Sequence, residues 1–333
     1  MREIGSEFWD VPVAESNNGL FPEFTQWFLS GRSALRAVIK EIGEARSVSL
    51  PSWCCDSMIK PFIEANYRIH FYPVYWQDSL VQEPSMECDV LLLLDYFGYS
   101  TSVTHLKGYK GIVIRDITHS LMSSTYNDAD YYFGSLRKWC GVWTGGYAWR
   151  TDGIRLPEGK DAKTGYVKLR EKAMQQKHDY INGCGNLGKK YLELFKAAEE
   201  YLEKSIFASG EDRDINLARK LDVDYIRSRR KSNAKVLIKA FPDWLIFPEI
   251  KDSDCPMFVP ILVPDGRRDE LRRYLIENKI YCPIHWPESA YHKLDEMTEK
   301  IYRNELSLVC DQRYSEDDMN RMIEVINIWK GAR

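Results

Sequence analysis

The 333-residue sequence lacks several features that would point to particular classes of protein. No apolar run approaches the roughly 20 residues that a membrane-spanning helix needs. The first residues, MREIGSEFWDVPVAESNNG, contain no basic stretch followed by an apolar one, as a secretory leader would. Acidic and basic residues are nearly balanced, at 49 and 46, and are intermixed along the chain. We therefore expect a cytoplasmic protein that binds neither membranes nor nucleic acid.

Cysteine occurs eight times, but in none of the patterns that bind zinc. The chain has no CxxC pair and no cluster of cysteine and histidine at the spacing of a zinc site. Isolated cysteines in a cytoplasmic protein are usually buried thiols. We expect buried free thiols at most of these positions and no metal site.

Apolar and aromatic residues are plentiful, at 44% and 13% of the sequence, which suffices for two ordinary domains or one large domain with an appendage. From about residue 30 to residue 150, amphipathic helical patterns alternate with short apolar runs. One run, CDVLLLLDYFG, is apolar on both faces, as a strand inside a parallel sheet should be. The alternation predicts an α/β fold with a mainly parallel sheet between helices. The expected strands are residues 47–51, 67–74, 88–98, 111–120, 130–135 and 145–150, and the expected helices are residues 31–45 and 56–66.

The remainder of the chain favours long helices and a smaller C-terminal unit. Strand and helix patterns alternate again near the C-terminus, after three long, charged helical patterns. We predict a large α/β domain over residues 1–235 and a small α+β domain over residues 236–333. The expected helices are residues 163–181, 188–207, 223–241, 267–278, 293–304 and 315–329, and the expected strands are residues 257–263, 279–286 and 306–310.

Ligands of α/β sheets bind beyond the carboxyl ends of the strands, and small polar residues precede the first predicted helix. In SGRSAL, residues 30–35, a glycine and two serines come before an amphipathic pattern. The N–H groups exposed at such a helix start suit a phosphate. The alternative is that Ser33 is a plain helix cap.

Two further candidates follow predicted strands. Asp116, in VIRDITHS, comes directly after an apolar strand, where a carboxylate would be partly desolvated and would favour a cationic partner. Alternatively, Asp116 caps the next turn and His119 is a loop histidine. Lys138, in GSLRKW, lies three residues after Ser135 and among aromatic residues. A lysine in an apolar pocket has a lowered pKa and can attack a carbonyl, whereas the alternatives are a lysine that extends to solvent or clamps a phosphate.

The order of these features resembles that of fold type I pyridoxal-phosphate enzymes. In particular, the sequence is similar to the DegT/StrS family of aminotransferases, best known for aminating keto-sugars carried on nucleotides. The resemblance extends from residue 30 to residue 319, with a looser stretch from about 151 to 250. The matching segments are SGRSAL, LPSWCCDS, LLLLDYFG, VIRDITHSL, ADYYFGSLRKW, GGYAW, IYCPIHWP and LSLVCDQRYSEDDM.

The resemblance implies catalytic roles for two residues. Lys138 would form the internal aldimine with pyridoxal 5'-phosphate and, once released, would move a proton between the substrate carbon and the cofactor. Asp116 would keep the pyridine nitrogen protonated, because an adjacent carboxylate raises the pKa of that nitrogen. His119 would contact the cofactor ring or its 3-hydroxyl.

The resemblance also implies binding roles. Arg32, Ser33 and Ser135 would receive the cofactor phosphate, and His285 and Trp286 would lie near the substrate. A homodimer with shared active sites is the family's arrangement. Glutamate is the amino donor in much of the family, and a nucleotide sugar is its commonest acceptor.

At several positions the chain departs from the family pattern. The family's usual SGT is SGR here, so Arg32 either adds charge to the phosphate site or faces outward. Strict alignment places Cys55 where the family often has an aromatic residue stacked on the cofactor ring, so either Trp53 takes that role by a shift or the ring is covered differently. Thr144 stands where an acidic residue often precedes the glycine pair. Asn186 is the candidate for the asparagine that a neighbouring subunit lends to the phosphate.

Three functions are compatible with these residues. The first is transamination of a keto-sugar, which the retention of Lys138 favours, since relatives that dehydrate sugars have lost this lysine. The second is another reaction of the same cofactor, such as elimination, decarboxylation or amino-acid transamination. The third is a non-catalytic descendant that keeps the fold. Arg137 has no assigned role, and the phosphate, a substrate carboxylate and the surface are its alternatives.

Overall fold

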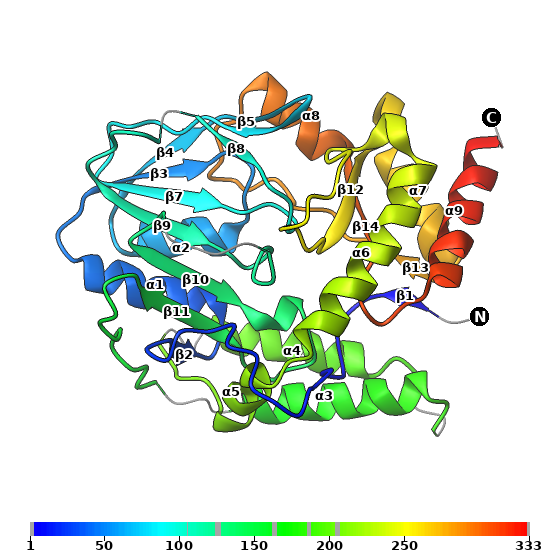
Figure 1. The fold of residues 1–333 in the computed structure, drawn as a ribbon, viewed down its shortest axis with the longest axis horizontal. Helices are drawn as coiled ribbons and strands as arrows, with labels where there is room; N and C mark the ends of the chain where they lie inside the picture. Colours follow the sequence, from blue (N-terminus) through cyan, green and yellow to red (C-terminus); the bar gives the residue numbers. More distant parts are fainter. Residues whose placement is uncertain are drawn as a thin grey trace. The chain divides into compact units, whose positions relative to one another are not determined.

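A computed structural model describes residues 3–104, 106–123, 128–161, 165–184, 188–203 and 207–331. The fold is mixed α/β, as predicted, and β-strands and helices alternate along the chain (Figure 1). The chain forms two compact units. The first unit comprises residues 1–6, 45–126 and 223–333, and the second comprises residues 7–44 and 127–222.

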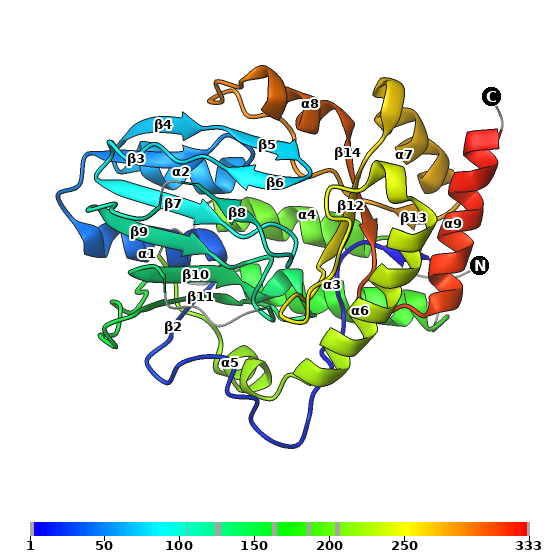
Figure 2. The ribbon, with the colours of Figure 1, turned by 45° about the horizontal axis from the view of Figure 1, so that its top comes forward.

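Four parallel strands form the sheet of the first unit, in the order β9-β7-β3-β4 (Figure 2). All five residues of the central strand β7 are buried, as its unbroken apolar sequence predicts. Helix α2, Asp56–Glu64, follows β3 despite containing Pro61. The strands are β3 (Ser47–Pro51), β4 (Arg68–Tyr72), β7 (Val90–Leu94) and β9 (Ile112–Asp116).

Short strands of the first unit were not predicted. Strands β5 (Val74–Gln77) and β6 (Ser79–Gln82) form an antiparallel hairpin, and β8 (Ser102–Val103) pairs with β6. The hairpin turns at Asp78, which has a positive φ of 55°, a conformation that aspartate tolerates better than most residues. Strand β1, Ile4–Gly5, pairs with β13, Ile280–Tyr281.

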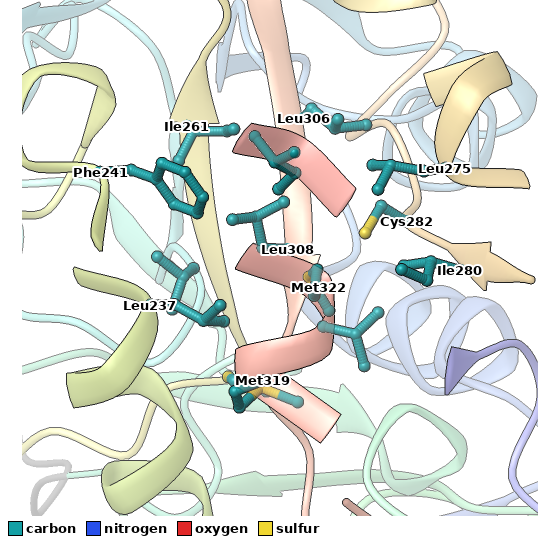
Figure 3. Packing of buried hydrophobic residues seen from close by; sticks show 14 of the residues in the cluster. Leu237, Phe241, Ile261, Leu275, Ile280, Cys282, Leu306, Leu308, Met319 and Met322 are labelled. Atoms are coloured by element: carbon teal, nitrogen blue, oxygen red, sulfur yellow. The ribbon is translucent and has the colours of Figure 1, made fainter. Parts of the chain in front are cut away.

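The C-terminal part of the first unit has its own apolar core. Strands β12 (Phe258–Leu262) and β14 (Glu305–Val309) pair antiparallel. Figure 3 shows Leu237, Ile261, Leu308 and Met322 packed together in this core. The helices around it are α6 (Val223–Ala240), α7 (Arg268–Glu277) and α9 (Glu316–Gly331), and α8 (Glu296–Asn304) precedes β14. Helix α6 runs through the predicted domain boundary at residues 235 and 236, which stays a prediction.

The second unit combines three antiparallel strands with helices. The strand order is β2-β11-β10. Helix α1, Gly31–Ile42, packs against all three strands, and Leu35, Val38 and Ile39 are buried as their spacing predicts, whereas Ile42 is half-buried. The strands are β2 (Gln26–Phe28), β10 (Tyr131–Ser135) and β11 (Gly146–Arg150), and the other helices are α3 (Tyr166–Ile181), α4 (Tyr191–Leu202) and α5 (Asp212–Arg219). Strand β2 and helix α5 were not predicted.

The cysteines, the helices and the candidate metal ligands can each be compared with the expectations from the sequence. Six of the eight cysteines are buried, while Cys55 is half-buried and Cys184 is exposed, so the prediction of mostly buried free thiols is confirmed. Among the residues described, no helix is both long and apolar enough to cross a bilayer. The same residues contain no group of three or more side chains suited to holding a metal ion.

Candidate functional site

Helix α1 begins with a serine cap, but the cap is Ser30 and not Ser33. Ser30 has an extended backbone, and its Oγ accepts the Ser33 N–H at 3.2 Å. Ser33 is buried, with its Oγ 3.2 Å from that of Ser30, so the plain-cap alternative for Ser33 is wrong. The amides of Gly31 and Arg32 lie in the first turn, where no helical carbonyl is available to them. These two N–H groups are suited to an anion.

Ser135 lies beside this helix start. It ends β10, and a Cβ placed on Gly31 would approach the Ser135 Cβ to 3.3 Å. Ser135 is only 8% exposed, and its Oγ has no hydrogen-bond partner among the residues described. Leaving a buried hydroxyl unpaired costs about 1–3 kcal/mol of folding free energy. A bound group that accepts a hydrogen bond from the Ser135 hydroxyl would remove this cost. The Ser135 hydroxyl and the α1 amides together fit a phosphate.

Lys138 ends a single turn of 3-10 helix, Leu136–Lys138, directly after β10. Its side chain is exposed, whereas the neighbouring Leu136 and Trp139 are fully buried. The expectation of an apolar pocket around this amine is therefore wrong, because the flanking apolar side chains turn into the core and the lysine turns outward. Within the described part of the chain, Lys138 has no hydrogen-bond or ion-pair partner. The amine is therefore accessible to a bound carbonyl compound.

The unassigned arginine beside Lys138 belongs to an ion-pair network. Arg137 donates to the Tyr166 hydroxyl at 3.0 Å and pairs with Glu199 at 2.8 Å. Burial acts to lower the pKa of Arg137, but Tyr166 and Glu199 outweigh it and raise that pKa above its usual range. Arg32 pairs with the same Glu199 at 3.4 Å and with Glu203. The Arg32 guanidinium is thus occupied by these two glutamates. The part of Arg32 that remains for the predicted phosphate contact is its backbone amide.

A carboxylate from α5 lies next to the glycine pair that follows Lys138. Asp214 accepts the Thr144 N–H at 2.7 Å and the Thr144 hydroxyl at 2.8 Å. Thr144 stands where the sequence resemblance leads us to expect an acidic residue. Asp214 supplies a carboxylate to this loop from 70 residues away in the sequence, which no local pattern could have indicated.

In the first unit, Asp116 is buried at the end of β9. One carboxylate oxygen accepts the Thr118 N–H at 2.8 Å and closes a tight turn. This is the geometry expected if Asp116 caps the turn that follows β9, the alternative that the sequence left open. The pairing of Asp116 with a cofactor nitrogen stays a prediction.

A second buried carboxylate follows the neighbouring strand β7. Asp95 pairs with Arg115 at 3.0 Å and accepts the Ser120 hydroxyl at 2.6 Å. Its N–H donates to the Asp116 carbonyl at 3.1 Å. Asp95 holds the 116–120 turn in place, a role that required the three-dimensional structure to recognise.

Four predicted residues of the first unit meet in one aromatic cluster: Trp53, His119, His285 and Trp286. The His119 ring stacks on Trp286 at a centroid distance of 5.6 Å, and it lies 5.4 Å from His285. Trp53 lies 5.9 Å from Trp286 and donates its indole N–H to the His285 carbonyl. One face of Trp53 is covered by Tyr96, stacked at 4.9 Å.

The remaining predicted residues lie outside these groups. Cys55 occupies the N-cap position of α2 without a capping hydrogen bond from its side chain, and its Sγ contacts the Ser57 hydroxyl at 2.8 Å. Of Trp53 and Cys55, only Trp53 lies among the aromatic rings. Asn186 lies outside the described residues.

Ser135→Ala tests the phosphate site. Removing an unpaired buried hydroxyl should leave the free energy of unfolding within about 0.5 kcal/mol of wild type or raise it slightly. Losing a hydrogen bond to a charged phosphate should weaken pyridoxal-phosphate binding about tenfold to a hundredfold. A cofactor titration and urea unfolding measure the two effects. Ser49→Ala is the matched control, because Ser49 is also a buried serine whose hydroxyl has no partner in the described structure. Equal cofactor affinities in the two variants would contradict the assignment.

No protein-family model matches the sequence, and no curated protein matches it. Solved structures do match. A DegT DnrJ EryC1 StrS aminotransferase from Brucella abortus is 15% identical with a TM-score of 0.61, over 92% of this chain and 85% of that one. The sugar aminotransferase CalS13 from Micromonospora echinospora is 14% identical with a TM-score of 0.59, over 91% of this chain and 86% of that one.

Spr1654 from Streptococcus pneumoniae is a third similar structure, and it has been solved in PLP and PMP forms. Its PMP form is 12% identical with a TM-score of 0.60, over 95% of this chain and 92% of that one. Likeness at such low identity establishes the fold. The chain therefore has the fold of fold type I pyridoxal-phosphate aminotransferases, as the sequence resemblance predicts.

Proposed function

We propose that this protein is a pyridoxal-phosphate-dependent aminotransferase of the DegT/StrS type. It would transfer an amino group from an amino acid, with glutamate as the first choice, to a nucleotide-linked keto-sugar in polysaccharide or glycoconjugate biosynthesis. The observation that carries the proposal is the unpaired, buried Ser135 hydroxyl beside the start of α1, three residues before the exposed Lys138. The fold shared with CalS13, a sugar aminotransferase, supports a keto-sugar as the acceptor.

The second unit would provide the phosphate site and the reactive amine. When bound, pyridoxal phosphate supplies an aldehyde and an electron-withdrawing ring. The Gly31 and Arg32 amides, with the Ser30 and Ser33 hydroxyls behind them, would hold the phosphate together with Ser135. Lys138 would hold the cofactor through its aldehyde group, and once the amine of the substrate has displaced it, the freed Lys138 amine would hold and move the proton at the substrate carbon.

The first unit would provide the groups that tune and cover the ring. The buried Asp116 carboxylate would hold a proton on the pyridine nitrogen. His119 and Trp53, both buried among aromatic rings, would contact the ring. His285 and Trp286 would contact the substrate and exclude water from it.

We also propose a cytoplasmic homodimer with shared active sites, to which Asn186 of the neighbouring copy would contribute a phosphate contact. The support for the dimer is the sequence resemblance. Sedimentation of the purified protein tests it, and a monomer at micromolar concentration would contradict it.

A single turnover with glutamate tests the proposed reaction. Protein loaded with pyridoxal phosphate should convert one equivalent of L-glutamate into 2-oxoglutarate while the cofactor becomes pyridoxamine phosphate. Absorbance and chromatography of the released cofactor follow the conversion. A bound cofactor that is converted by no amino donor would contradict transamination and would favour elimination or decarboxylation. A protein that binds no cofactor at all would favour the non-catalytic alternative.

A further inference from the structure

A buried chain of hydrogen bonds connects a carboxyl group to one ring nitrogen of His285. Glu305 and Ser307 are two residues apart on strand β14, so their side chains lie on the same face. The Ser307 hydroxyl is 2.5 Å from Glu305 Oε1 and 2.9 Å from His285 Nδ1. Glu305 Oε2 accepts the backbone N–H of His285 at 2.7 Å. All three side chains are at least 95% buried, since their exposures are 0%, 0% and 5%.

The same heavy-atom geometry admits two proton arrangements. When Glu305 is ionised, Ser307 donates to Glu305 and accepts from His285, so the imidazole proton is on Nδ1. When Glu305 is protonated, its O–H donates to Ser307, and the Ser307 O–H donates to Nδ1. In this second arrangement the imidazole proton is on Nε2, because a neutral imidazole carries only one.

We propose that Glu305 and Ser307 form a proton relay that sets which ring nitrogen of His285 carries the proton. Starting from protonated Glu305, the Glu305 proton passes to Ser307 Oγ, the Ser307 proton passes to His285 Nδ1, and the proton on Nε2 leaves to a base or to water. Glu305 ends as a carboxylate and His285 stays neutral, so one proton is released. The reverse sequence takes up one proton at Nε2.

The surroundings of the relay are consistent with a carboxyl group that titrates near neutral pH. Burial raises the pKa of Glu305 to about 8, although the Ser307 hydroxyl, the His285 N–H and the charge of Arg268 on α7 act in the opposite direction. Cys282, which interacts electrostatically with Glu305, is a neutral thiol, because burial raises its pKa to about 12. His119 is the other titratable ring beside His285, at 5.4 Å.

The catalytic use of the relay rests on the proposed function, in which His285 lies at the substrate. Glu305 and Ser307 would then be positioning residues, because they act through the imidazole. Below the pKa of Glu305, His285 would present a hydrogen-bond donor to the substrate from Nε2, and above it an acceptor. The tautomer itself does not require a substrate or a cofactor.

Nitrogen-15 NMR of histidine side chains tests the relay in the ligand-free protein. The chain has six histidines, and His285→Gln identifies the signals of this one. We expect the proton to be on Nε2 well below pH 8 and on Nδ1 well above it, with the change centred near the pKa of Glu305 of about 8. A single tautomer throughout, or a doubly protonated ring below the transition, would overturn the proposal.

Two variants separate a relay from a merely structural role. In Glu305→Gln, the amide oxygen must accept the His285 N–H, which directs the amide NH2 to Ser307 and fixes the proton on His285 Nε2 at every pH. In Ser307→Ala, the link is cut and the pH-dependent change of tautomer should disappear. Ser49→Ala, another fully buried serine, should keep the change. If Glu305→Gln does not fold, Ser307→Ala alone tests the relay. A pH-dependent change of tautomer that persists in Ser307→Ala would overturn the proposal.

Different results would contradict the proposed function and the proton relay. If the tautomer changes as expected but glutamate is not converted, the relay stands and the aminotransferase assignment falls. If glutamate is converted and the wild-type tautomer does not change, the relay falls alone. If the tautomer changes and glutamate is converted, kcat should change with pH around pH 8, and Glu305→Gln should remove this pH dependence.

Discussion

Lys138→Ala is expected to abolish amino transfer, by at least a factor of about 1,000, and to remove the visible absorbance that the protein gains with pyridoxal phosphate. The stability should change little. Because Lys138 is exposed and has no partner among the residues described, its loss should shift the free energy of unfolding by less than about 0.5 kcal/mol. Spectra of the loaded protein, glutamate turnover and urea unfolding measure these effects.

Lys138→Arg distinguishes a reactive amine from a phosphate clamp. Arginine keeps the positive charge and can bind a phosphate, but it cannot bond to an aldehyde carbon as a free amine does. We expect this variant to be as inactive as Lys138→Ala. An arginine variant with wild-type turnover would instead assign Lys138 the role of a clamp.

Gly146→Ala should destabilise the protein strongly. A Cβ at Gly146 would lie 2.0 Å from the Ser30 carbonyl oxygen and 2.3 Å from its carbon, both backbone atoms that no rotamer change can move. Ser30 caps α1, so relieving the overlap requires β11 and the helix start to separate. We expect a loss of more than about 2 kcal/mol of stability, together with weaker cofactor binding, because the phosphate site includes the same helix start.

Gly43→Ala provides the matched control at the other end of α1. Gly43 ends the helix with a positive φ of 76°, and a Cβ there would have no atom within 4 Å. Alanine in that conformation, which has a ψ of −112°, should cost about 1–3 kcal/mol of backbone strain without affecting the cofactor. Urea unfolding and cofactor titration of both variants test the contrast. Equal losses of stability and affinity would contradict the claim that Gly146 sets the position of the phosphate site.

Helices and strands with a long apolar or amphipathic pattern were predicted correctly from the sequence. Strand β7 and helix α1 owe their positions to side-chain periodicity that the sequence displays directly. Strand β2 has only three residues and depends on pairing with β11, so its own sequence carries little signal. Helix α5 is short and charged, and only Asp214 and Ala218 of its residues are buried.

The environment of lysine residues was harder to predict. Lys138 stands between aromatic residues in the sequence, yet it is exposed. Lys177 lies in a charged helical pattern, yet it is 1% exposed, with its amine over the ring of Trp9 at 5.0 Å and donating to the Glu7 carbonyl. Burial of one side chain depends on which residues distant in the chain cover it, and neighbours in the sequence do not determine that.

The same reason explains the carboxylates that sequence reasoning missed. Asp214 reaches Thr144 across 70 residues, and Glu305 reaches His285 across 20. The first contact joins helix α5 to the loop before β11, and the second joins strand β14 to the segment after β13. The strand-end rule nevertheless drew attention to Asp116 and His119, and the structure joins Asp95 to Ser120 in that same turn.

The most direct test of the central claim is to trap the cofactor on the wild-type protein. Borohydride reduction of the protein loaded with pyridoxal phosphate, followed by digestion and mass spectrometry, should find the cofactor's mass on one peptide, at Lys138. The same treatment of Lys138→Ala should find no modified lysine. Modification of another lysine in the wild-type protein, or none at all, would contradict the assignment of Lys138 as the residue that carries the cofactor.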